Sequence, residues 1–535
     1  GKVATLPPDA FAPTGQFTAK VERRRWHMIA IFGFQQLINT AMWITFSPIA
    51  LETKDLYKVH VMWVNTLSLI SLALFLPGMI LCSYITTKLG LRYVVLVAAA
   101  LQATAGVVRY ASVYLLAPGR EVAAFAVLFL GQTIGAFAQP ICTNLPVRIA
   151  GDWFPVSERD TATTLGNVGF GLGNLVGMGV PGYLVWTSVD SSLKNGVVVH
   201  GVDRLLFAEF ALSLCGFVWT WVGFVEEPEE PPSVAAAEKR KARRQIGDTT
   251  PGTPGPSVEI LSKLRQDYID LLRNRNFNLV LFSFCIGLGL FNSVFTVLEQ
   301  LLRPAGYGPF ESGVIGNTFI LGGVFTSAVV AQLLDKTHAY GLILKACFTL
   351  TALTTANMFL NIRPDSFYIV CIVSAIMGAA CLPLLPVSLA VGAEVSYPIP
   401  EEASTGLLIF SGNLAGVAFT MVYGYLIPMA SRFLTVWTPS AKFTLVAVVL
   451  ATFASMMLKE DNRRFDAEKK QCLLEQGGSS VEVRFSRHGS VDSTTQDRKR
   501  STLSASLSGG LGGHFVQSSD SIFSQYRLGE DRDSA

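Results

Sequence analysis

Long apolar runs recur along most of the chain and constrain the fold more than any other feature of the sequence. A transmembrane helix needs about 20 mostly apolar residues. The windows of this kind are 26–50, 61–85, 92–116, 122–147, 161–185, 205–225, 277–302, 312–334, 341–361, 367–393, 404–428 and 441–458. They are too long and continuous for membrane barrel strands, which alternate over about ten residues. The sequence therefore predicts an all-α membrane protein with twelve transmembrane helices.

The composition excludes several functional classes. Half of the 535 residues are hydrophobic and 15% are charged, against about 25% charged in soluble domains. A net charge of +3 does not indicate a nucleic-acid partner. The eight cysteines show no CxxC pair or metal-ligand spacing. Since no nucleophile–base set or ATP-binding loop is evident either, we expect no enzyme, no cofactor and no metal site.

Basic residues predict the orientation of the helices. Arg23, Arg24 and Arg25 precede the first window, and the segment 226–276 holds nine Lys and Arg. Such clusters mark the cytoplasmic side. The predicted organisation is a cytoplasmic N-terminal tail (1–25), a six-helix bundle (26–225), a cytoplasmic linker with an amphipathic helix (226–276), a second six-helix bundle (277–458) and a disordered cytoplasmic tail (459–535). We expect the plasma membrane rather than an endolysosomal or other organelle membrane.

Two pairs of polar loops suggest internal repetition. "SYITTKLGLRY" (83–93) has a counterpart in "QLLDKTHAYG" (332–341), and "DWFPVSERDTATTLG" (from 152) has one in "EVSYPIPEEASTGLL" (from 394). These loops resemble those of the major facilitator superfamily, although Ser83 and Thr87 depart from its first-half motif. The resemblance implies two pseudo-symmetric six-helix bundles, the major facilitator fold.

The charges of these loops suggest a cytoplasmic gate. Alternating access requires the two bundles to part on one side of the membrane while they meet on the other. Exposed ion pairs contribute only about 0–1 kcal/mol each, so a few of them can favour the closed state without preventing the gate from opening. The predicted gate residues are Lys88, Arg92, Glu158, Arg159, Asp335, Lys336, Glu394 and Glu402. The alternative is that these residues only cap helices or lie solvated in loops.

Four longer segments resemble one family within that superfamily. They are "NTAMWITFSPIA" (39–50), "FAQPICTNLPVRIAGDWFPVSERDTAT" (137–163), "VLEQLLRPAG" (297–306) and "AEVSYPIPEEASTGLL" (393–408). They are similar to the feline leukaemia virus subgroup C receptor-related carriers, nearest to the orphan branch. The resemblance implies a carrier of a small organic solute, such as choline, ethanolamine or another choline-like amine, haem or a vitamin. We expect a monomer in the lipid bilayer that acts as a facilitator or uniporter. The alternative is a non-transporting receptor or metabolite sensor on the same fold.

The resemblance also implies a binding site. In choline-handling members the quaternary ammonium lies between a Trp of the first helix and a Tyr of the seventh. Trp43 matches the Trp, whereas Asn292 replaces the Tyr, which counts against choline because a cation over one ring gains only about 0.5–2 kcal/mol. The predicted substrate-binding residues are Asn39, Trp43, Gln139, Asn292, Gln300 and Asn413.

Several of these residues stand out without the resemblance, because polar groups deep in apolar spans usually face a cavity or another helix. Trp43 could instead anchor at the headgroups. Arg109 pairs within the bundle or snorkels outward, and Glu209 and Glu299 could be solvated near outer helix ends. In the stretch 166–177, Gly169, Gly173 and Gly177 are spaced four apart, which predicts tight helix packing rather than a phosphate loop.

Overall fold

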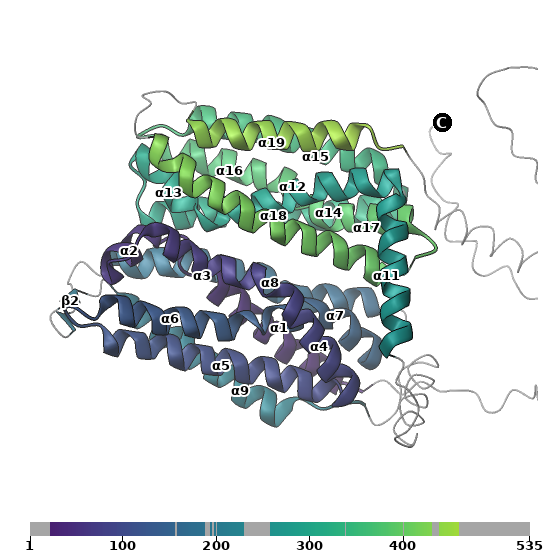
Figure 1. Cartoon of the computed structure of the whole chain (residues 1–535), viewed down its shortest axis with the longest axis horizontal. Helices are drawn as coiled ribbons and strands as arrows, with labels where there is room; N and C mark the ends of the chain where they lie inside the picture. Colours follow the sequence, from purple (N-terminus) through teal and green to yellow (C-terminus); the bar gives the residue numbers. More distant parts are fainter. Residues whose placement is uncertain are drawn as a thin grey trace, which may run out of the picture. The chain divides into compact units, whose positions relative to one another are not determined.

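The computed structural model describes residues 22–155, 158–187, 193–194, 197–198, 201–228, 257–337, 339–399, 401–430 and 438–459. Helices dominate this part of the chain (Figure 1). The N-terminal half holds α1 (Arg24–Ile44), α2 (Ala50–Tyr57), α3 (Val61–Ala73), α4 (Phe75–Lys88), α5 (Leu91–Leu115), α6 (Glu121–Ala136), α7 (Gln139–Trp153), α8 (Arg159–Thr187), β1 (Leu193–Lys194), β2 (Val197–Val198) and α9 (Val202–Gly223). After α11 (Ser257–Arg273), the C-terminal half holds α12 (Arg275–Thr296), α13 (Leu298–Leu302), η3 (Arg303–Ala305), α14 (Pro309–Thr337), α15 (Tyr340–Asn361), α16 (Phe367–Cys381), α17 (Leu384–Ser396), α18 (Glu401–Ala430) and α19 (Pro439–Met456).

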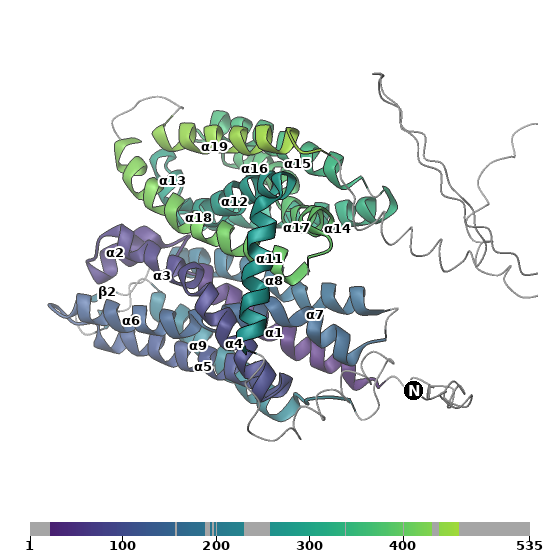
Figure 2. The ribbon, with the colours of Figure 1, turned by 45° about the vertical axis from the view of Figure 1, so that its right-hand side comes forward.

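The helices pack as two halves that meet along one side. In the N-terminal half α1 packs on α8, and α5 contacts α6 and α9. In the C-terminal half α14 packs on α16 and α12 on α18. The halves meet chiefly where α8 contacts α14 and where α3 contacts α18. Figures 1 and 2 show the purple and blue N-terminal half beside the teal and green C-terminal half in both views.

The predicted fold class is confirmed. Among the described residues, eleven helical segments are long and apolar enough to cross a bilayer, and α1 completes the set of twelve. It is 21 residues long but less apolar, because it carries Gln35, Gln36, Asn39 and Thr40, all of them buried. Such polar side chains are tolerated in a span when neighbouring helices shield them from lipid.

Four predicted windows after the first are not continuous helices, which corrects the sequence interpretation. The window 277–302 breaks at Val297, between α12 and α13. The second span breaks at Leu74 between α3 and α4, the fourth breaks between α6 and α7, and the tenth breaks between α16 and α17. A proline lies in or just after each of these last three breaks: Pro77, Pro140 and Pro383. Proline has no N–H to donate to the carbonyl four residues earlier and clashes with it. Hydropathy alone does not register such a break.

Short helices cap one end of the bundles. The first predicted window runs to residue 50, but α1 ends at Ile44, and a turn containing Pro48 leads into α2. We call this end, with α2, α13, η3 and the β1–β2 pair, the α2 end; the opposite end, with α11 and the starts of α8 and α18, is the α11 end (Figure 1). Positive charge in the sequence leads us to expect the α2 end outside the cell and the α11 end in the cytoplasm.

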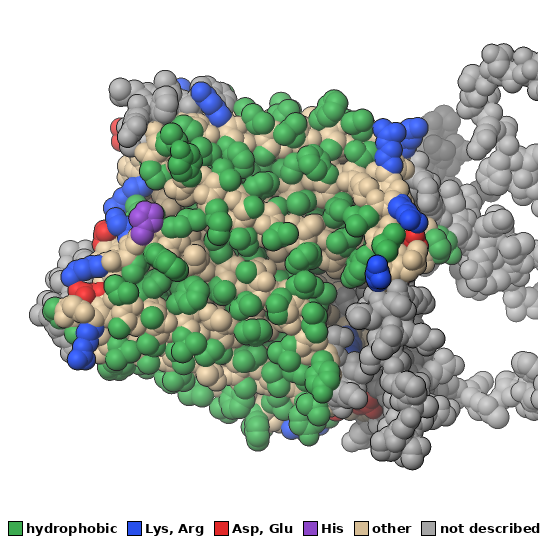
Figure 3. Space-filling view, in the orientation of Figure 1, with side chains coloured by type: hydrophobic (Ala, Val, Ile, Leu, Met, Phe, Trp, Pro, Cys, Tyr) green, Lys and Arg blue, Asp and Glu red, His purple; other side chains and the backbone are tan. Residues whose placement is uncertain are grey.

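The surface fits a bilayer. Large apolar side chains are exposed along the spans, among them Val222, Phe325 and Tyr368. Figure 3 shows a broad green apolar face, with Lys, Arg, Asp and Glu gathered toward its two ends. A soluble monomer rarely exposes an apolar patch of this extent, so this surface is covered by lipid.

The glycines of α8 pack tightly, as predicted, and the structure shows that their partner is α1. An added side chain at Gly169, Gly173 or Gly177 would strike carbonyl oxygens of Gly33, Leu37 or Ala41 at 2.1–2.7 Å. Backbones can approach this closely only where small residues line the contact. The prediction of tight packing is confirmed, and it fixes the position of α1, the helix that carries Asn39 and Trp43.

Candidate functional site

One face of α3 brings several predicted residues together. Asn65, Ser68 and Leu72 follow one another at intervals of three and four residues, so they lie on one side of the helix. All three are buried, on a helix that packs against α18 of the other half. Each contacts, or lies beside, a different residue of the predicted site. Sequence reasoning missed Asn65 and Ser68, although their helical spacing is visible.

Trp43 lies inside the protein. Its indole Nε1 donates to the Ser68 carbonyl at 3.2 Å, and the Ser68 hydroxyl donates back to the Trp43 carbonyl at 3.2 Å. Only 4% of the Trp43 surface is exposed, and the ring belongs to an apolar cluster that includes Leu72 and Phe295. The alternative of a headgroup anchor is therefore wrong, while a role in binding stays a prediction.

Asn292 and Asn413 form a buried amide pair in the C-terminal half. Nδ2 of Asn292 donates to Oδ1 of Asn413 at 3.1 Å. A Cβ atom at Gly416 would lie 3.0 Å from Asn292 Cβ and 3.2 Å from Leu72 Cδ1. Asn292 thus lies at the junction with α3, on the other half of the molecule from Trp43. The structure brings these three predicted residues to the same junction.

Gln300 contacts a different part of α3. Its Nε2 donates to Asn65 Oδ1 at 2.6 Å, and Asn65 Nδ2 donates to Gln300 Oε1 at 3.4 Å. The two amides satisfy each other across the junction of the halves. Gln300 therefore lies nearer the α2 end than Asn292, in a contact that holds the halves together.

Asn39 and Gln139 belong to the N-terminal half. Asn39 precedes Trp43 by one helical turn on the same face of α1, and its Nδ2 donates to the Gly135 carbonyl at 3.4 Å. Gln139 opens α7 directly after the break that follows α6. Among the described residues no donor reaches the buried Oε1 of Gln139. A buried acceptor without a donor is costly, so this oxygen is suited to a donor from a bound solute.

The aromatic ring next to Asn292 does not replace the missing Tyr. Phe291 packs against Phe295 and Phe319, with ring centroids 4.7 and 6.2 Å away. Successive residues of a helix point about 100° apart, and this ring faces α14 within the C-terminal half. That Trp43 fills one aromatic position of the choline-handling pattern stays a prediction from the resemblance.

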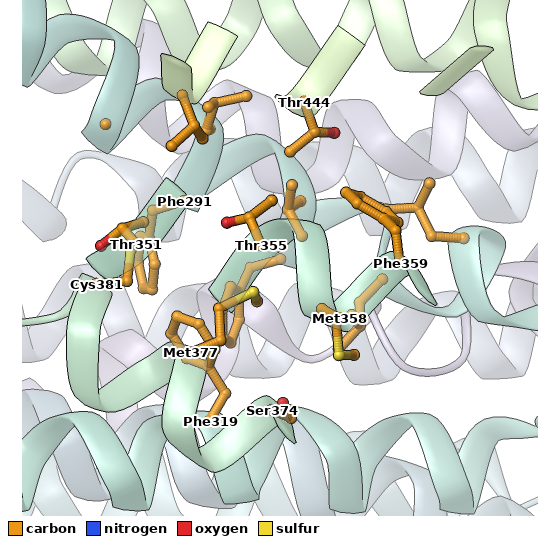
Figure 4. Close-up of a pocket in the computed structure, with 18 of the residues that line it drawn as sticks. Phe291, Phe319, Thr351, Thr355, Met358, Phe359, Ser374, Met377, Cys381 and Thr444 are labelled. Atoms are coloured by element: carbon orange, nitrogen blue, oxygen red, sulfur yellow. The ribbon is translucent and has the colours of Figure 1, made fainter. Parts of the chain in front are cut away.

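A cavity of about 100 Å³ lies within the C-terminal half (Figure 4). It is almost wholly apolar, and Phe291, Phe319, Met358 and Met377 are among the side chains around it. None of the six predicted substrate-binding residues lines it. Its polar side chains are a few hydroxyls among many apolar groups: Thr351, Thr355, Ser374 and Thr444. Since a polar solute buried there would find few partners, we do not assign the cavity to the substrate.

Polar contacts join the halves at the α2 end. Ser47 Oγ donates to the Phe295 carbonyl, Leu51 N donates to Glu299 Oε2 at 3.0 Å, Arg303 Nη1 lies 3.3 Å from Glu52 Oε1, and Asn65 pairs with Gln300. We call these four contacts the seam. Each joins a residue of the N-terminal half to one of the C-terminal half. Glu299 is fully buried, so the interpretation of a solvated carboxylate there is wrong.

The predicted gate residues lie at the α11 end. Glu158 pairs with Arg25 at 2.9 Å, Arg92 Nη2 donates to the Trp221 carbonyl at 3.4 Å, and Arg159 Nη2 donates to the Gly151 carbonyl at 3.5 Å. These contacts stay within the N-terminal half. Glu394 is buried near the end of α17. The side chains of Lys88, Asp335, Lys336 and Glu402 lie outside the described part of the chain, and pairing across the halves stays a prediction.

A buried ion pair in the N-terminal half answers the question left open for Arg109. Its Nη2 lies 3.0 Å from Glu209 Oε2, and the two side chains are 1% and 11% exposed. Thr45 donates to the same carboxylate, and the guanidinium carbon stands 5.1 Å from the centroid of the Phe46 ring. Arg109 thus pairs within the bundle. The pair joins α5 and α9 to the end of α1.

Comparison with known proteins places the chain among carriers. It is 27% identical over 404 residues to "Solute carrier family 49 member A3" of Xenopus tropicalis, covering 75% of this chain and 77% of that protein. It is 26% identical over 473 residues to the choline/ethanolamine transporter flvcr2a of Danio rerio, covering 88% of this chain and 93% of that protein. It is 26% identical to the choline/ethanolamine transporter FLVCR1 of Mus musculus, covering 82% of this chain and 76% of that protein.

Solved structures share the fold at low identity. The xylose transporter XylE from E. coli in its inward-open conformation aligns with a TM-score of 0.62 at 12% identity, covering 84% of this chain and 99% of that one. A bacterial homolog of the human lysosomal transporter Spinster aligns with a TM-score of 0.57 at 14% identity, covering 86% and 100%. The family model described as "Major Facilitator Superfamily" matches residues 28–420. With two six-helix halves, a polar junction between them and this match over most of its length, the chain belongs to the Major Facilitator Superfamily and is a secondary transporter of the membrane.

Proposed function

We propose that this transporter carries a small organic solute with a primary ammonium group, and that it prefers ethanolamine to choline. Relatives over most of the chain are choline/ethanolamine transporters. A quaternary ammonium has no N–H and is recognised mainly by aromatic faces, whereas a primary ammonium donates three hydrogen bonds. The proposed site consists of Asn39, Trp43, Gln139, Asn292 and Asn413, with Gln300 bordering it.

The unpaired oxygen of Gln139 is the observation that carries this preference. It is buried without a described donor, so an ammonium N–H would supply the bond it lacks. Where the choline-handling pattern has a second ring, Asn292 offers an amide already paired with Asn413. One ring and several amides favour an N–H donor over a methylated cation. The amides and the indole supply no nucleophile or general base, which supports a carrier rather than an enzyme.

Alternating access about the junction provides the mechanism that we propose. The site lies between the halves, where carriers of this plan bind their solute, and one chain supplies both halves, which supports a monomer. We also propose the plasma membrane, with the α11 end in the cytoplasm. Glycosylation tags at 190–200 and 235–245 test the orientation. Modification of the tag at 235–245 and not of the tag at 190–200 would indicate the opposite orientation.

Uptake of labelled ethanolamine and choline into cells expressing the chain tests the substrate. We expect faster ethanolamine uptake, and we expect Gln139→Leu to lower it about tenfold, since a hydrogen bond to a charged group contributes about 1.5–3 kcal/mol. Gln266→Leu, on exposed α11, is the matched control and should change nothing. Equal or faster choline uptake would refute the preference. If no amine, vitamin or haem is transported by a chain that reaches the surface, the receptor or sensor alternative is favoured.

A further inference from the structure

Two carboxyl groups from opposite halves meet in the seam. Glu299 lies on α13 and Glu52 on α2. Their side chains are 0% and 19% exposed, and the same nitrogen of Arg303, Nη1, lies 3.6 Å from a carboxylate oxygen of Glu299 and 3.3 Å from one of Glu52. Sequence reasoning did not pair them, because about 250 residues separate them.

The charges around Glu299 do not balance. Arg303 is the cation that faces both groups: its Nη1 lies 3.6 Å from Glu299 Oε1 and 3.3 Å from Glu52 Oε1. That guanidinium is 47% exposed, so water weakens its field. In the first turn of α14, which also packs on α13, the carboxylate of Glu311 accepts from Gly308 N in its own loop. Two ionised carboxylates beside one half-exposed cation would leave a negative charge buried in the seam.

Two oxygens of the pair lack a donor. Glu299 Oε2 accepts from Leu51 N at 3.0 Å, and Glu52 Oε1 faces Arg303. Among the described residues no hydrogen-bond donor reaches the buried atoms Oε1 of Glu299 and Oε2 of Glu52. One proton on the pair would supply a donor and remove the excess charge. Acidic groups held together in this way share a proton, as close carboxyl pairs do elsewhere.

We propose that Glu299 and Glu52 form a proton-binding site that closes the α2 end of the transporter. The proton binds when the seam forms and leaves when the halves part and water reaches Glu299. Because the pair is part of the seam, the proton enters and leaves on the same side of the membrane. The site therefore makes opening sensitive to pH at the α2 end without moving protons across the bilayer. It goes beyond the proposed substrate and does not depend on it.

The sign of the pH dependence follows from the closed state. Burial, and then the charge of Glu52, raise the pKa of Glu299 to about 9; in the open state the group is solvated and titrates near its ordinary value of about 4.3. Between these values the closed state holds one proton more than the open state. Lowering the pH in this window favours closure, by up to about tenfold in the closed-to-open ratio per pH unit. Above about pH 9 the stabilisation is lost.

Thiol labelling of the full chain in nanodiscs tests the proposal. Ser47→Cys places a reporter in the buried seam, and a methanethiosulfonate reagent reaches it only when the α2 end opens. The rate is measured from pH 5 to pH 8 with Glu299 present and with Glu299→Gln, after subtracting the signal of the chain without the reporter. The quantity compared is the rate with Glu299 divided by the rate with Glu299→Gln. Both chains carry the same thiol, so the effect of thiol ionisation cancels in this ratio.

We expect that ratio to rise at least tenfold between pH 5 and pH 8, because Glu299→Gln mimics the protonated, closed form at every pH. Glu311→Gln is the matched control and should follow the parent chain. A ratio that stays flat with pH, or a Glu299→Gln chain that labels faster than the parent, would overturn the proposal. If Glu299→Gln does not fold, Glu52→Gln takes its place. This variant removes the second acceptor of the shared proton and should lessen the pH dependence of labelling. An unchanged pH dependence would equally overturn the proposal.

Discussion

The two ends of the transporter use polar side chains differently. At the α2 end, Ser47, Leu51, Glu52 and Asn65 of the N-terminal half contact residues of the C-terminal half. At the α11 end, the contacts described for Arg25, Arg92, Glu158 and Arg159 stay within the N-terminal half. The seam is therefore a closure between halves, whereas the Arg25–Glu158 pair and the Arg92 contact at the α11 end lie within one half.

This difference shows that the contacts described between the halves at the α2 end do not come from the charged loops of the α11 end. The α11 end carries the conspicuous sequence clusters, yet its described pairs fasten α1 and α9 to neighbouring segments of their own half. The seam includes residues that the sequence analysis did not single out, such as Ser47 and Asn65. Its strength comes from burial, because a buried polar group left without its partner costs more than an exposed one.

The largest expected effect is on the seam. Asn65→Ala leaves the Gln300 amide buried and unpaired, at a cost of about 1–3 kcal/mol. Opening at the α2 end should then rise roughly 5- to 150-fold, measured as labelling of Ser47→Cys. Gln300→Ala should act alike, and the double variant should add little to either single one. Asn361→Ala, which alters an exposed Asn pair on α15, is the control. Equal labelling in all chains would mean that the amide pair does not hold the halves closed.

The second effect belongs to the α11 end and should not reach the seam. The Glu226 carboxylate accepts from Leu91 N at 2.7 Å and from Arg92 N at 2.8 Å, at the start of α5. Glu226→Ala removes this cap and should lower the free energy of unfolding by about 1–2 kcal/mol, seen as a lower Tm. Labelling of Ser47→Cys should be unchanged. Asp55→Asn, an exposed carboxylate, serves as the control. Faster labelling with an unchanged Tm would instead mean that this end participates in gating.

The sequence predicts the twelve spans and the two halves because both depend on local apolar content, which a single chain displays. It also predicts Trp43 and Asn292 as polar groups in apolar surroundings. The pairings could not be predicted, since Glu52 with Glu299 and Asn65 with Gln300 join helices from different halves. The prolines at three of the helix breaks, Pro77, Pro140 and Pro383, can be read in the sequence. The apolar content of those spans nevertheless led to the prediction of continuous helices.

The third prediction concerns the site beside the seam. Asn292→Tyr adds a ring at the junction where Trp43 also lies and should shift the preference toward choline over ethanolamine by up to roughly tenfold, about 1.4 kcal/mol. The measurement is the ratio of the two uptake rates. Phe291→Tyr is the matched control, because that ring faces α14 within the C-terminal half and should leave the ratio unchanged. If Asn292→Tyr leaves it unchanged as well, Asn292 does not face the solute.

The smallest effect is expected for the Arg25–Glu158 pair. The pair joins the start of α1 to the segment before α8 at 2.9 Å, and its side chains are 13% and 39% exposed, so solvent limits its contribution to about 1 kcal/mol or less. Glu158→Arg alone should lower Tm slightly, and adding Arg25→Glu should restore it, because both charges lie in one half. Reagent access to cysteines along α8 and α18 from the α11 end should stay constant throughout. If access rises in the single variant and falls again in the double, Glu158 acts on the gate between the halves, and the contrast between the two ends would no longer hold.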